Sequence, residues 1–340
     1  MKRILSAAGV AAAAAALGAG LWLGGRSAAE DAVVRYDRES RYYRIRVVDY
    51  PDQGRRCLRF SRYGGVQSSM KLQDPTALDL RYSKSFVAAL ALHPDPKKVL
   101  LVGLGGASIP KFIHRHWPHV QMDIVELDAG VVKVCQQFFG FKGAPGMRVI
   151  LMDGRMYLKR TREKYDVILL DAFAVDYIPF HLTTWEFLRL VREHLKPGGV
   201  VASNLWQRLT PGGTSGSRRK GRLKRGGADP DGLRFPRTRF CDAELRTLQA
   251  VFPQTYLFLA GTSGNVIVFG TLSPERVSED AWAERAARLA EGKDLGFNLP
   301  QIVRNEYTVL TDRRIKAPLL TDNKAPVGTL RHEHPKSYGE

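Results

Sequence analysis

One stretch constrains the fold more than any other part of the chain. Residues 97–128 read KKVLLVGLGGASIPKFIHRHWPHVQMDIVELD: an apolar run, a glycine-rich turn, a helical segment and a second apolar run that ends in an acid. Residues 99–102 suit a buried parallel strand, and the glycines after them permit a tight turn and close approach of a ligand to the backbone. Glu126 follows Gly106 by about 20 positions, the spacing at which nucleotide-binding α/β folds place a carboxylate for ribose hydroxyls. This stretch therefore predicts a site for an adenosine-containing ligand.

Apolar runs and helical segments continue to alternate after this stretch. The pattern predicts an α/β fold: a doubly wound, mostly parallel sheet, Rossmann-like and of the class I methyltransferase type, closed by an antiparallel hairpin. Lys196-Pro197-Gly198-Gly199 predicts the end of a helix before the fifth strand. The expected parallel strands are 99–102, 122–125, 148–151, 165–170 and 199–204; the expected helices of this domain are 108–117, 129–139, 155–161, 183–195 and 242–252; the hairpin strands are 255–260 and 265–270.

The composition changes along the chain suggest a division into four parts. Alternating β-rich runs and turns between Tyr36 and Met70 predict a small antiparallel sheet ahead of the main domain. A Gly- and Arg-rich stretch interrupts the main domain and predicts a flexible insertion. We expect a signal peptide or membrane anchor at 1–29, an N-terminal β-hairpin domain at 30–75, a nucleoside-binding catalytic domain at 76–275 with the insertion at 211–236, and a C-terminal helix and tail at 276–340.

The N-terminus and the net charge bear on location and partners. Residues 4–25 carry no charge and are rich in alanine, which suits either a cleaved signal or a single anchor. More arginines follow this segment than basic residues precede it, so a retained anchor favours a cytoplasmic-facing domain, whereas cleavage near Ala29 predicts a secreted or periplasmic protein. The formal net charge is +18, and the basic tract Arg218–Arg225 could meet an anionic membrane surface; nucleic acid is not favoured.

Polar residues follow four of the expected parallel strands. Because ligands of open α/β sheets bind outside the carboxyl ends of the strands, we expect these residues to meet at one site. The candidates for binding a cofactor are Gly103, Gly105, Gly106, Glu126, Asp128, Asp153 and Gly154, and Asp171 ends the fourth strand. Asp176 and His181 follow in the next loop and are, together with Tyr82, the candidates on the substrate side. The histidines and cysteines lack metal-ligand spacing, so no metal site is expected.

The same residues resemble a known family. From about Gly64 to Trp206 the chain resembles the spermidine synthase (polyamine aminopropyltransferase) family, a branch of the class I AdoMet-dependent transferases. Val66-Gln67-Ser68 is similar to its "GVIQ" segment and Tyr82 to the tyrosine of its "DEFxYxE" stretch. The resemblance implies that Gln67 lies near the donor nucleoside, Glu126 binds ribose, Asp153-Gly154 lies beside adenine, and Asp171 is the catalytic Asp of the "DSSDP" loop.

The chain departs from the family pattern at three places, and two of them concern acids. Gly106 replaces the Asp of the family's "GGGDGG" turn, and Ser83 stands where a Gln or His is expected. The "DSSDP" loop reads Asp171-Ala172-Phe173-Ala174-Val175-Asp176, with the second acid displaced by two positions. In the family these acids hold the donor amine and the cationic polyamine, since a buried ammonium without a counter-charge is costly. Nucleoside binding therefore survives the comparison better than polyamine binding.

The leading hypothesis is an aminopropyltransferase-like enzyme, expected as a homodimer. Its donor would be decarboxylated AdoMet or AdoMet, its acceptor a small-molecule amine, and Asp171 the general base for in-line attack on the carbon next to the sulfonium. A second hypothesis keeps the fold but makes it an AdoMet-dependent methyltransferase with an anionic or membrane-borne acceptor. A third is a non-catalytic nucleoside-binding scaffold. A dinucleotide oxidoreductase ranks below these, because Ser108 stands where its third glycine belongs.

Overall fold

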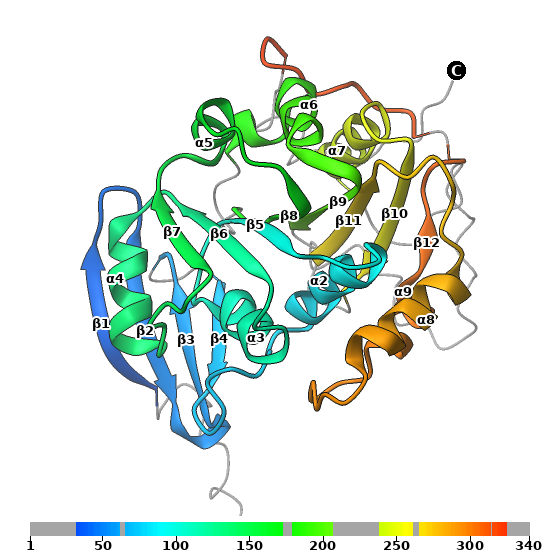
Figure 1. The fold of residues 1–340 in the computed structure, drawn as a ribbon. Helices are drawn as coiled ribbons and strands as arrows, with labels where there is room; N and C mark the ends of the chain where they lie inside the picture. The colour runs from blue at the N-terminus through cyan, green and yellow to red at the C-terminus, as the bar shows by residue number, and fades with distance from the viewer. Residues whose placement is uncertain are drawn as a thin grey trace, which may run out of the picture.

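The chain folds into two sheets, a small N-terminal one and a large one covered by helices (Figure 1). The computed structural model describes residues 32–61, 65–172, 179–206, 238–260, 265–313 and 315–324. The expected signal or anchor segment, Asp176 and the basic tract Arg218–Arg225 lie outside these ranges. Within the described ranges, no helix has both the length and the apolar character that a bilayer span needs.

The N-terminal sheet is antiparallel with the order β1-β2-β3-β4, as the alternating sequence predicted. Its elements are β1 (Val33–Glu39), β2 (Arg44–Tyr50), the 3₁₀ turn η1 (Pro51–Gln53), β3 (Arg55–Arg59) and β4 (Ser68–Lys71). Apolar side chains at Ile45, Val47 and Leu58 turn one face toward the main domain and join its core. On β2, the buried carboxylate of Asp49 pairs with Arg35 and Arg56, which offsets its burial.

The large sheet has eight strands in the order β12-β10-β11-β9-β8-β5-β6-β7. Strands β5 to β9 pair in parallel, and β11 runs antiparallel to both β9 and β10. The chain winds from β5 to one side and from β8 to the other, which places a topological switch point between these two strands. The strands are β5 (Lys98–Val102), β6 (Gln121–Glu126), β7 (Met147–Leu151), β8 (Tyr165–Leu170), β9 (Leu195–Trp206), β10 (Gln254–Leu259), β11 (Asn265–Thr271) and β12 (Thr308–Val309). The predicted fold class is confirmed.

Helices cover both faces of the large sheet. They are α2 (Arg81–Leu92), α3 (Ser108–His116), α4 (Ala129–Phe138), α5 (Gly154–Arg160), the 3₁₀ turn η2 (Phe180–Leu182), α6 (Trp185–Glu193), α7 (Arg239–Gln249), α8 (Glu279–Ala290) and α9 (Leu299–Glu306). Several begin at a side chain that accepts from the first helical turn: Asp128 for α4, Asp153 for α5, Thr184 for α6 and Ser278 for α8. Such caps satisfy backbone donors that the helix itself leaves unpaired.

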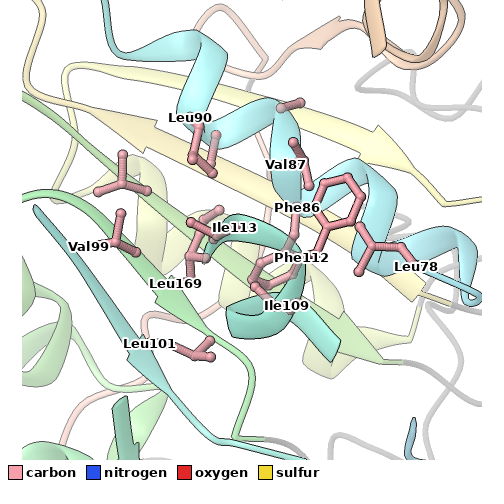
Figure 2. Packing of buried hydrophobic residues seen from close by; sticks show 14 of the residues in the cluster. Leu78, Phe86, Val87, Leu90, Val99, Leu101, Ile109, Phe112, Ile113 and Leu169 are labelled. Atoms are coloured by element: carbon pink, nitrogen blue, oxygen red, sulfur yellow. The ribbon is translucent and has the colours of Figure 1, made fainter. Parts of the chain in front are cut away.

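The parallel strands are apolar on both faces because helices cover both sides. On β5, Val99 and Leu101 belong to one buried cluster and Leu100 and Val102 to the other, as strand alternation requires. Figure 2 shows the first cluster, in which side chains of α2 and α3 pack over β5 and β8. The residues labelled there are Leu78, Phe86, Val87, Leu90, Val99, Leu101, Ile109, Phe112, Ile113 and Leu169.

Two sequence expectations for this domain are wrong in detail. Lys196-Pro197-Gly198-Gly199 does not separate a helix from a strand: α6 ends at Glu193 and β9 already begins at Leu195. Tyr165 pairs with Leu195 but Val167 pairs with Val200, so the four residues form a bulge within β9, and Gly198 takes its left-handed φ of 71°. The sequence also failed to predict α9 and β12, which lie in a stretch rich in prolines and charges.

The C-terminal elements are part of the main domain. Trp282 of α8 is fully buried, donates from Nε1 to the carbonyl of Ala88 on α2 at 3.0 Å, and contacts the rings of Tyr256 and Phe258. β12 pairs with β10 at the edge of the sheet. These contacts close one face of the sheet against α2, the helix that carries Tyr82.

Candidate functional site

A cavity of about 1200 Å³ lies at the carboxyl ends of the parallel strands. It is bounded by the large sheet, the N-terminal sheet and the start of α2. This is the edge at which open α/β sheets bind ligands. The predicted residues that line it are Gln67, Tyr82, Gly103, Gly105, Glu126, Asp153, Gly154, Asp171 and His181. Gly106 and Asp128 do not line it, and Asp176 lies outside the described residues.

The glycine turn after β5 is dictated by close backbone contacts. Gly103 has φ of 99°, and a Cβ at this position would lie 2.3 Å from the carbonyl oxygen of Asp171. Gly105 also has positive φ, at 53°. At the start of α5, a Cβ on Gly154 would lie 2.5 Å from a methyl of Val102. Glycine therefore lets the ends of β5 and β8 and the start of α5 approach one another and shape one wall of the cavity.

Gly106 faces the N-terminal sheet instead of the cavity. A Cβ there would lie 2.6 Å from Oγ of Ser68 and 3.2 Å from the ring of Phe139. Ser68 Oγ lies 3.3 Å from Ser108 Oγ, so small polar side chains fill the space beside the turn. The position at which the family turn carries Asp thus has neither a carboxylate nor room for one without movement of Ser68.

Glu126 joins the glycine turn to the end of β6. Its Oε2 accepts from the amide of Leu104 and its Oε1 from the amide of Asp128, each at 2.9 Å. Burial raises the pKa of this carboxyl, and the backbone donors oppose that rise. A carboxylate offers about four acceptor positions, so the backbone donors leave capacity for a donor from the cavity, as a ribose hydroxyl would supply.

Asp128 has a structural place next to this site. Its Oδ1 accepts from the amide of Gly130 at 2.7 Å and caps α4, and its Oδ2 accepts a hydrogen bond from Ser40 Oγ. Ser40 lies between β1 and β2, so the pair ties the N-terminal sheet to α4. The sequence predicts Asp128 as a cofactor ligand, and the structure shows that each of its two carboxylate oxygens also accepts a hydrogen bond from the protein.

Asp153 and His181 form a pair on the opposite wall. Asp153 Oδ1 accepts from the amide of Met156 at 2.9 Å, and its Oδ2 lies 2.7 Å from Nε2 of His181. Burial opposes ionisation of Asp153, but His181 and the amide outweigh it and lower its pKa. Arg155 Nη1 donates to the carbonyl of His181 at 3.2 Å and helps to fix the turn that carries the imidazole.

A segment near the C-terminus holds this turn in place, and we call residues 315–324 the C-terminal strap. Asp322 forms an ion pair with Arg155 at 2.5 Å and accepts from Thr184 Oγ1 at 2.8 Å. Leu320 accepts from the amide of Trp185 at 2.7 Å. No local sequence pattern predicts these contacts, because they join residues more than 130 positions apart.

Asp171 lies at the centre of a polar network at the sheet edge. Its Oδ1 accepts from Asn204 Nδ2 at 2.9 Å and its Oδ2 from Tyr82 Oη at 3.3 Å. Asn204 in turn accepts from Asn265 Nδ2 at 3.0 Å, so the network links β11, β9, β8 and α2. Burial raises the pKa of Asp171, and burial together with the Asp171 carboxyl raises the pKa of Tyr82. This is a carboxyl that can take up a proton at the cavity wall.

The cavity also has an aromatic and basic border that the sequence analysis missed. Tyr43 and Phe60 lie against it with their rings stacked, 4.4 Å between centroids and 11° between planes. Arg41 and Tyr42 lie beside them at the turn between β1 and β2. Among the residues that the structure describes, no group of three or more His, Cys, Asp or Glu side chains is arranged to hold a metal ion.

Glycine turn, strand-end carboxyls and cavity together define a Rossmann-like transferase of the methyltransferase type. The sequence profile of the spermine/spermidine synthase domain matches residues 84–207. The polyamine aminopropyltransferase of Vibrio vulnificus is 30% identical over 306 residues, which are 87% of this chain and 91% of that protein. The chain belongs to the polyamine aminopropyltransferase (spermine/spermidine synthase) family.

Solved structures share the fold. Human methyltransferase-like protein 13, solved in complex with SAH, is 28% identical and superposes with a TM-score of 0.50 over 66% of this chain and 93% of that chain. A spermidine synthase in complex with the transition state analogue AdoDATO is 20% identical, with a TM-score of 0.60 over 82% of this chain and 85% of that one. The sheet and its helices are thus common to methyltransferases and to this family.

Proposed function

We propose that this transferase moves an aminopropyl group from decarboxylated AdoMet to a small amine, with Asp171 as the general base. The observation that carries the proposal is the Asp171 carboxyl, held on the cavity wall by Asn204 and Tyr82 at the edge where the donor nucleoside would bind. Family membership supports the reaction class, and the relative from Vibrio vulnificus carries the name polyamine aminopropyltransferase.

The donor would lie along the glycine turn. Gly103 and Gly105 leave the backbone open to it, Glu126 would accept from its ribose hydroxyls, and Asp153 would contact adenine beside Gly154. Gln67 lies on the same cavity wall as Tyr82, whose Oη lies 3.5 Å from the Gln67 carbonyl. The similar structures with SAH and AdoDATO are consistent with a nucleoside of this type.

The reaction would be an in-line displacement at the carbon next to sulfur. The acceptor nitrogen forms a bond to that carbon, the carbon–sulfur bond breaks with its electron pair going to sulfur, and methylthioadenosine leaves. Asp171 takes one proton from the attacking amine. The protein then contributes alignment of the two reactants and proton removal, and these are effects that the described side chains can supply.

Calorimetric binding of decarboxylated AdoMet, AdoMet and methylthioadenosine to the full-length protein tests the donor. We expect the decarboxylated donor to bind most tightly and, with an amine present, to yield methylthioadenosine by mass spectrometry. Tighter binding of AdoMet with release of S-adenosylhomocysteine would establish methyl transfer instead, an alternative that the missing carboxylate at Gly106 motivates. Absence of binding by all three nucleosides would overturn the proposal.

A further inference from the structure

Three polar side chains lie next to one another at the carboxyl edge of the large sheet. Leu170 of β8 pairs with Ser203 of β9, so Asp171 and Asn204, one residue further along, are neighbours at this edge. Asn265 is the first residue of β11, which pairs antiparallel with β9, and it is the diagonal neighbour of Asn204 on the same face of the sheet. Strand register therefore places the side chain of Asn204 between those of Asp171 and Asn265.

The side-chain amide of Asn204 makes two hydrogen bonds of opposite sense. Its Nδ2 donates to Asp171 Oδ1 at 2.9 Å, and its Oδ1 accepts from Asn265 Nδ2 at 3.0 Å. Asn204 is 6% exposed, so unpaired amide groups at this position would be costly. Turning the amide by half a rotation would set its NH₂ group against that of Asn265 and its carbonyl against the Asp171 carboxylate. Asn265 thus selects the one orientation of Asn204 that donates to Asp171.

The two oxygens of the Asp171 carboxyl are held to different degrees. Oδ1 has the amide bond from Asn204, whereas Oδ2 lies 3.3 Å from Tyr82 Oη, which is longer than the distance of about 2.7–2.8 Å typical of a hydroxyl donor. Tyr82 Oη also lies 3.5 Å from the carbonyl of Gln67, a second acceptor for the same hydroxyl. Oδ2 is therefore the carboxyl oxygen with the weaker contact and the one open to an incoming proton.

The protonation of Asp171 depends on the groups that face it. Burial raises the pKa of Asp171, and the hydrogen bonds from Asn204 and Tyr82 oppose that rise, Asn204 more than Tyr82. Tyr82 is the titratable side chain that contacts the Asp171 carboxyl among the residues that the structure describes. The other charged or titratable side chains along the same cavity, within the described ranges, are Arg41, Arg81, Glu126, Asp153 and His181.

We propose that Asn265 is a positioning residue for the transfer reaction: it orients the amide of Asn204, which holds Asp171 Oδ1 and leaves Oδ2 to take the proton. The inference rests on the proposed function, because it assigns a role within that reaction. In the proton transfer, one N–H bond of the acceptor ammonium breaks, its electron pair stays on nitrogen, and an O–H bond forms at Oδ2. Asn265 acts through Asn204 and contacts none of the reacting atoms.

Asn265→Asp tests this arrangement because it replaces the donor at residue 265 by an acceptor. The Asn204 amide would then turn its NH₂ group toward the new carboxylate and its carbonyl toward Asp171, which favours protonated Asp171. We expect the acidic limb of kcat/KM against pH to move to higher pH by about one pH unit, as loss of a charge-assisted hydrogen bond does. Above that limb kcat should return to the wild-type value, whereas a merely structural role would lower kcat at every pH.

A double-variant cycle separates the reversed amide from the added negative charge. Asn204→Leu removes the amide and should itself move the acidic limb to higher pH. In the Asn204→Leu protein, Asn265→Asp contributes only its charge, so its further displacement of the limb should be smaller than in the protein that keeps Asn204. Asn305→Asp is the matched control: Asn305 is exposed on α9, bonded to Gln301 at 2.7 Å, and its replacement should not move the limb.

Carbon-13 NMR titration of the Asp171 carboxyl, assigned by its loss in Asp171→Asn, follows the same ionisation without turnover. Unchanged binding of methylthioadenosine shows that each variant is folded, and Asn265→Ala, which only frees the Asn204 amide, should give a smaller displacement in the same direction. An unmoved Asp171 titration in both Asn265 variants would overturn the inference. So would an equal displacement by Asn265→Asp with and without the Asn204 amide.

Failure of the proposed function would look different from failure of this inference. The wild-type protein would then form no methylthioadenosine from decarboxylated AdoMet and an amine at any pH. The NMR titration would still report whether Asn265 controls the ionisation of Asp171 through Asn204.

Discussion

Asp171 and Tyr82 share a hydrogen bond at the wall of the cavity, and that arrangement sets how the site responds to pH. Burial raises the pKa of Asp171, so the folded protein binds the carboxyl proton more tightly than the unfolded chain does. The contribution of Asp171 to the free energy of unfolding is fully present at pH values below its pKa in the unfolded chain. It is lost as the pH rises through the pKa of Asp171 in the folded protein. The proposed role as general base requires the ionised form, because only the carboxylate accepts a proton.

Asp171→Asn should therefore separate stability from activity. We expect the variant to lose about 10²- to 10⁴-fold in kcat, the usual contribution of a general base, while binding methylthioadenosine with unchanged Kd. The free energy of unfolding of Asp171→Asn should exceed that of the wild-type protein at neutral pH, because asparagine places no ionisable group at this position. Urea denaturation at several pH values and a steady-state assay check both parts. Retention of wild-type kcat would remove Asp171 from the mechanism.

Gly103 offers a second prediction for a single residue. Gly103→Ala should destabilise the protein by about 2–4 kcal/mol, because a Cβ would meet the Asp171 carbonyl and φ is positive. Gly140→Ala is the control: its φ is also positive, at 66°, but no atom lies within 4 Å of the added carbon, so about 1 kcal/mol is expected. If chemical denaturation shows that Gly103→Ala and Gly140→Ala lose the same free energy of unfolding, the glycine turn can shift to accommodate the added carbon.

At the scale of elements, a buried network below the site joins three strands and a helix. Asp123 of β6 accepts from Arg148 of β7 at 2.8 Å, from Tyr165 of β8 at 2.7 Å and from Tyr157 of α5 at 3.1 Å. Burial opposes its ionisation, but these donors outweigh burial and lower the pKa of Asp123. The stability from this network is present above the unfolded pKa and is lost as pH falls through the folded pKa.

We expect Asp123→Asn to cost about 1.5–3 kcal/mol at neutral pH, the usual range for a hydrogen bond to a charged group. The cost should shrink as pH falls below about 4, where the wild-type carboxyl is itself protonated in the unfolded chain. Thermal unfolding of both proteins across this pH range provides the measurement. A cost that stays constant with pH would show that packing, not charge, holds these strands together.

The elements that the sequence predicted well are those specified by local pattern. β8 was placed with its observed bounds because 165–170 is a continuous apolar run between polar segments. The sequence pattern does not predict α9, because its start, Asn298 followed by Pro300, lies among prolines and charged residues that are as typical of a tail as of a helix cap and first turn. The bulge in β9 was missed because Gly198 and Gly199 usually mark a helix end.

Within the site, the sequence predicted the strand-end carboxyls but not their partners. Asp171 and Glu126 follow apolar strands, so topology alone brings them to one edge. The Asn265–Asn204 contact depends on β11 inserting between β9 and β10. It arises from a pairing between distant segments, which no local spacing encodes.

At the scale of the whole molecule, the cavity is formed jointly by the two sheets. β4 packs on the glycine turn through Ser68, and Arg56 of β3 donates to the carbonyl of Phe138 at 2.5 Å. A nucleoside in the cavity would contact residues of both sheets, so its binding energy should stabilise them together. Linkage makes this effect depend only on ligand concentration and Kd.

Methylthioadenosine at about 100 times its Kd should raise the free energy of unfolding by about 2.7 kcal/mol. Hydrogen exchange should show added protection in β4 and in the glycine turn after β5, since both border the ligand. Protection confined to the large sheet would show that the N-terminal sheet does not close on the nucleoside. Glu126→Gln is a suitable comparison, because it removes the proposed ribose acceptor and should reduce both effects.

The C-terminal strap has a consequence for the order in which the protein becomes functional. The chain emerges from the ribosome with the glycine turn and Asp171 first, and domains fold as they appear. The turn carrying His181 is fixed only when Asp322 and Leu320 reach Thr184, Arg155 and Trp185. The sheet can thus form during synthesis before this wall of the cavity is fixed, so the nascent enzyme should remain inactive until the C-terminal strap has been synthesised and has bound.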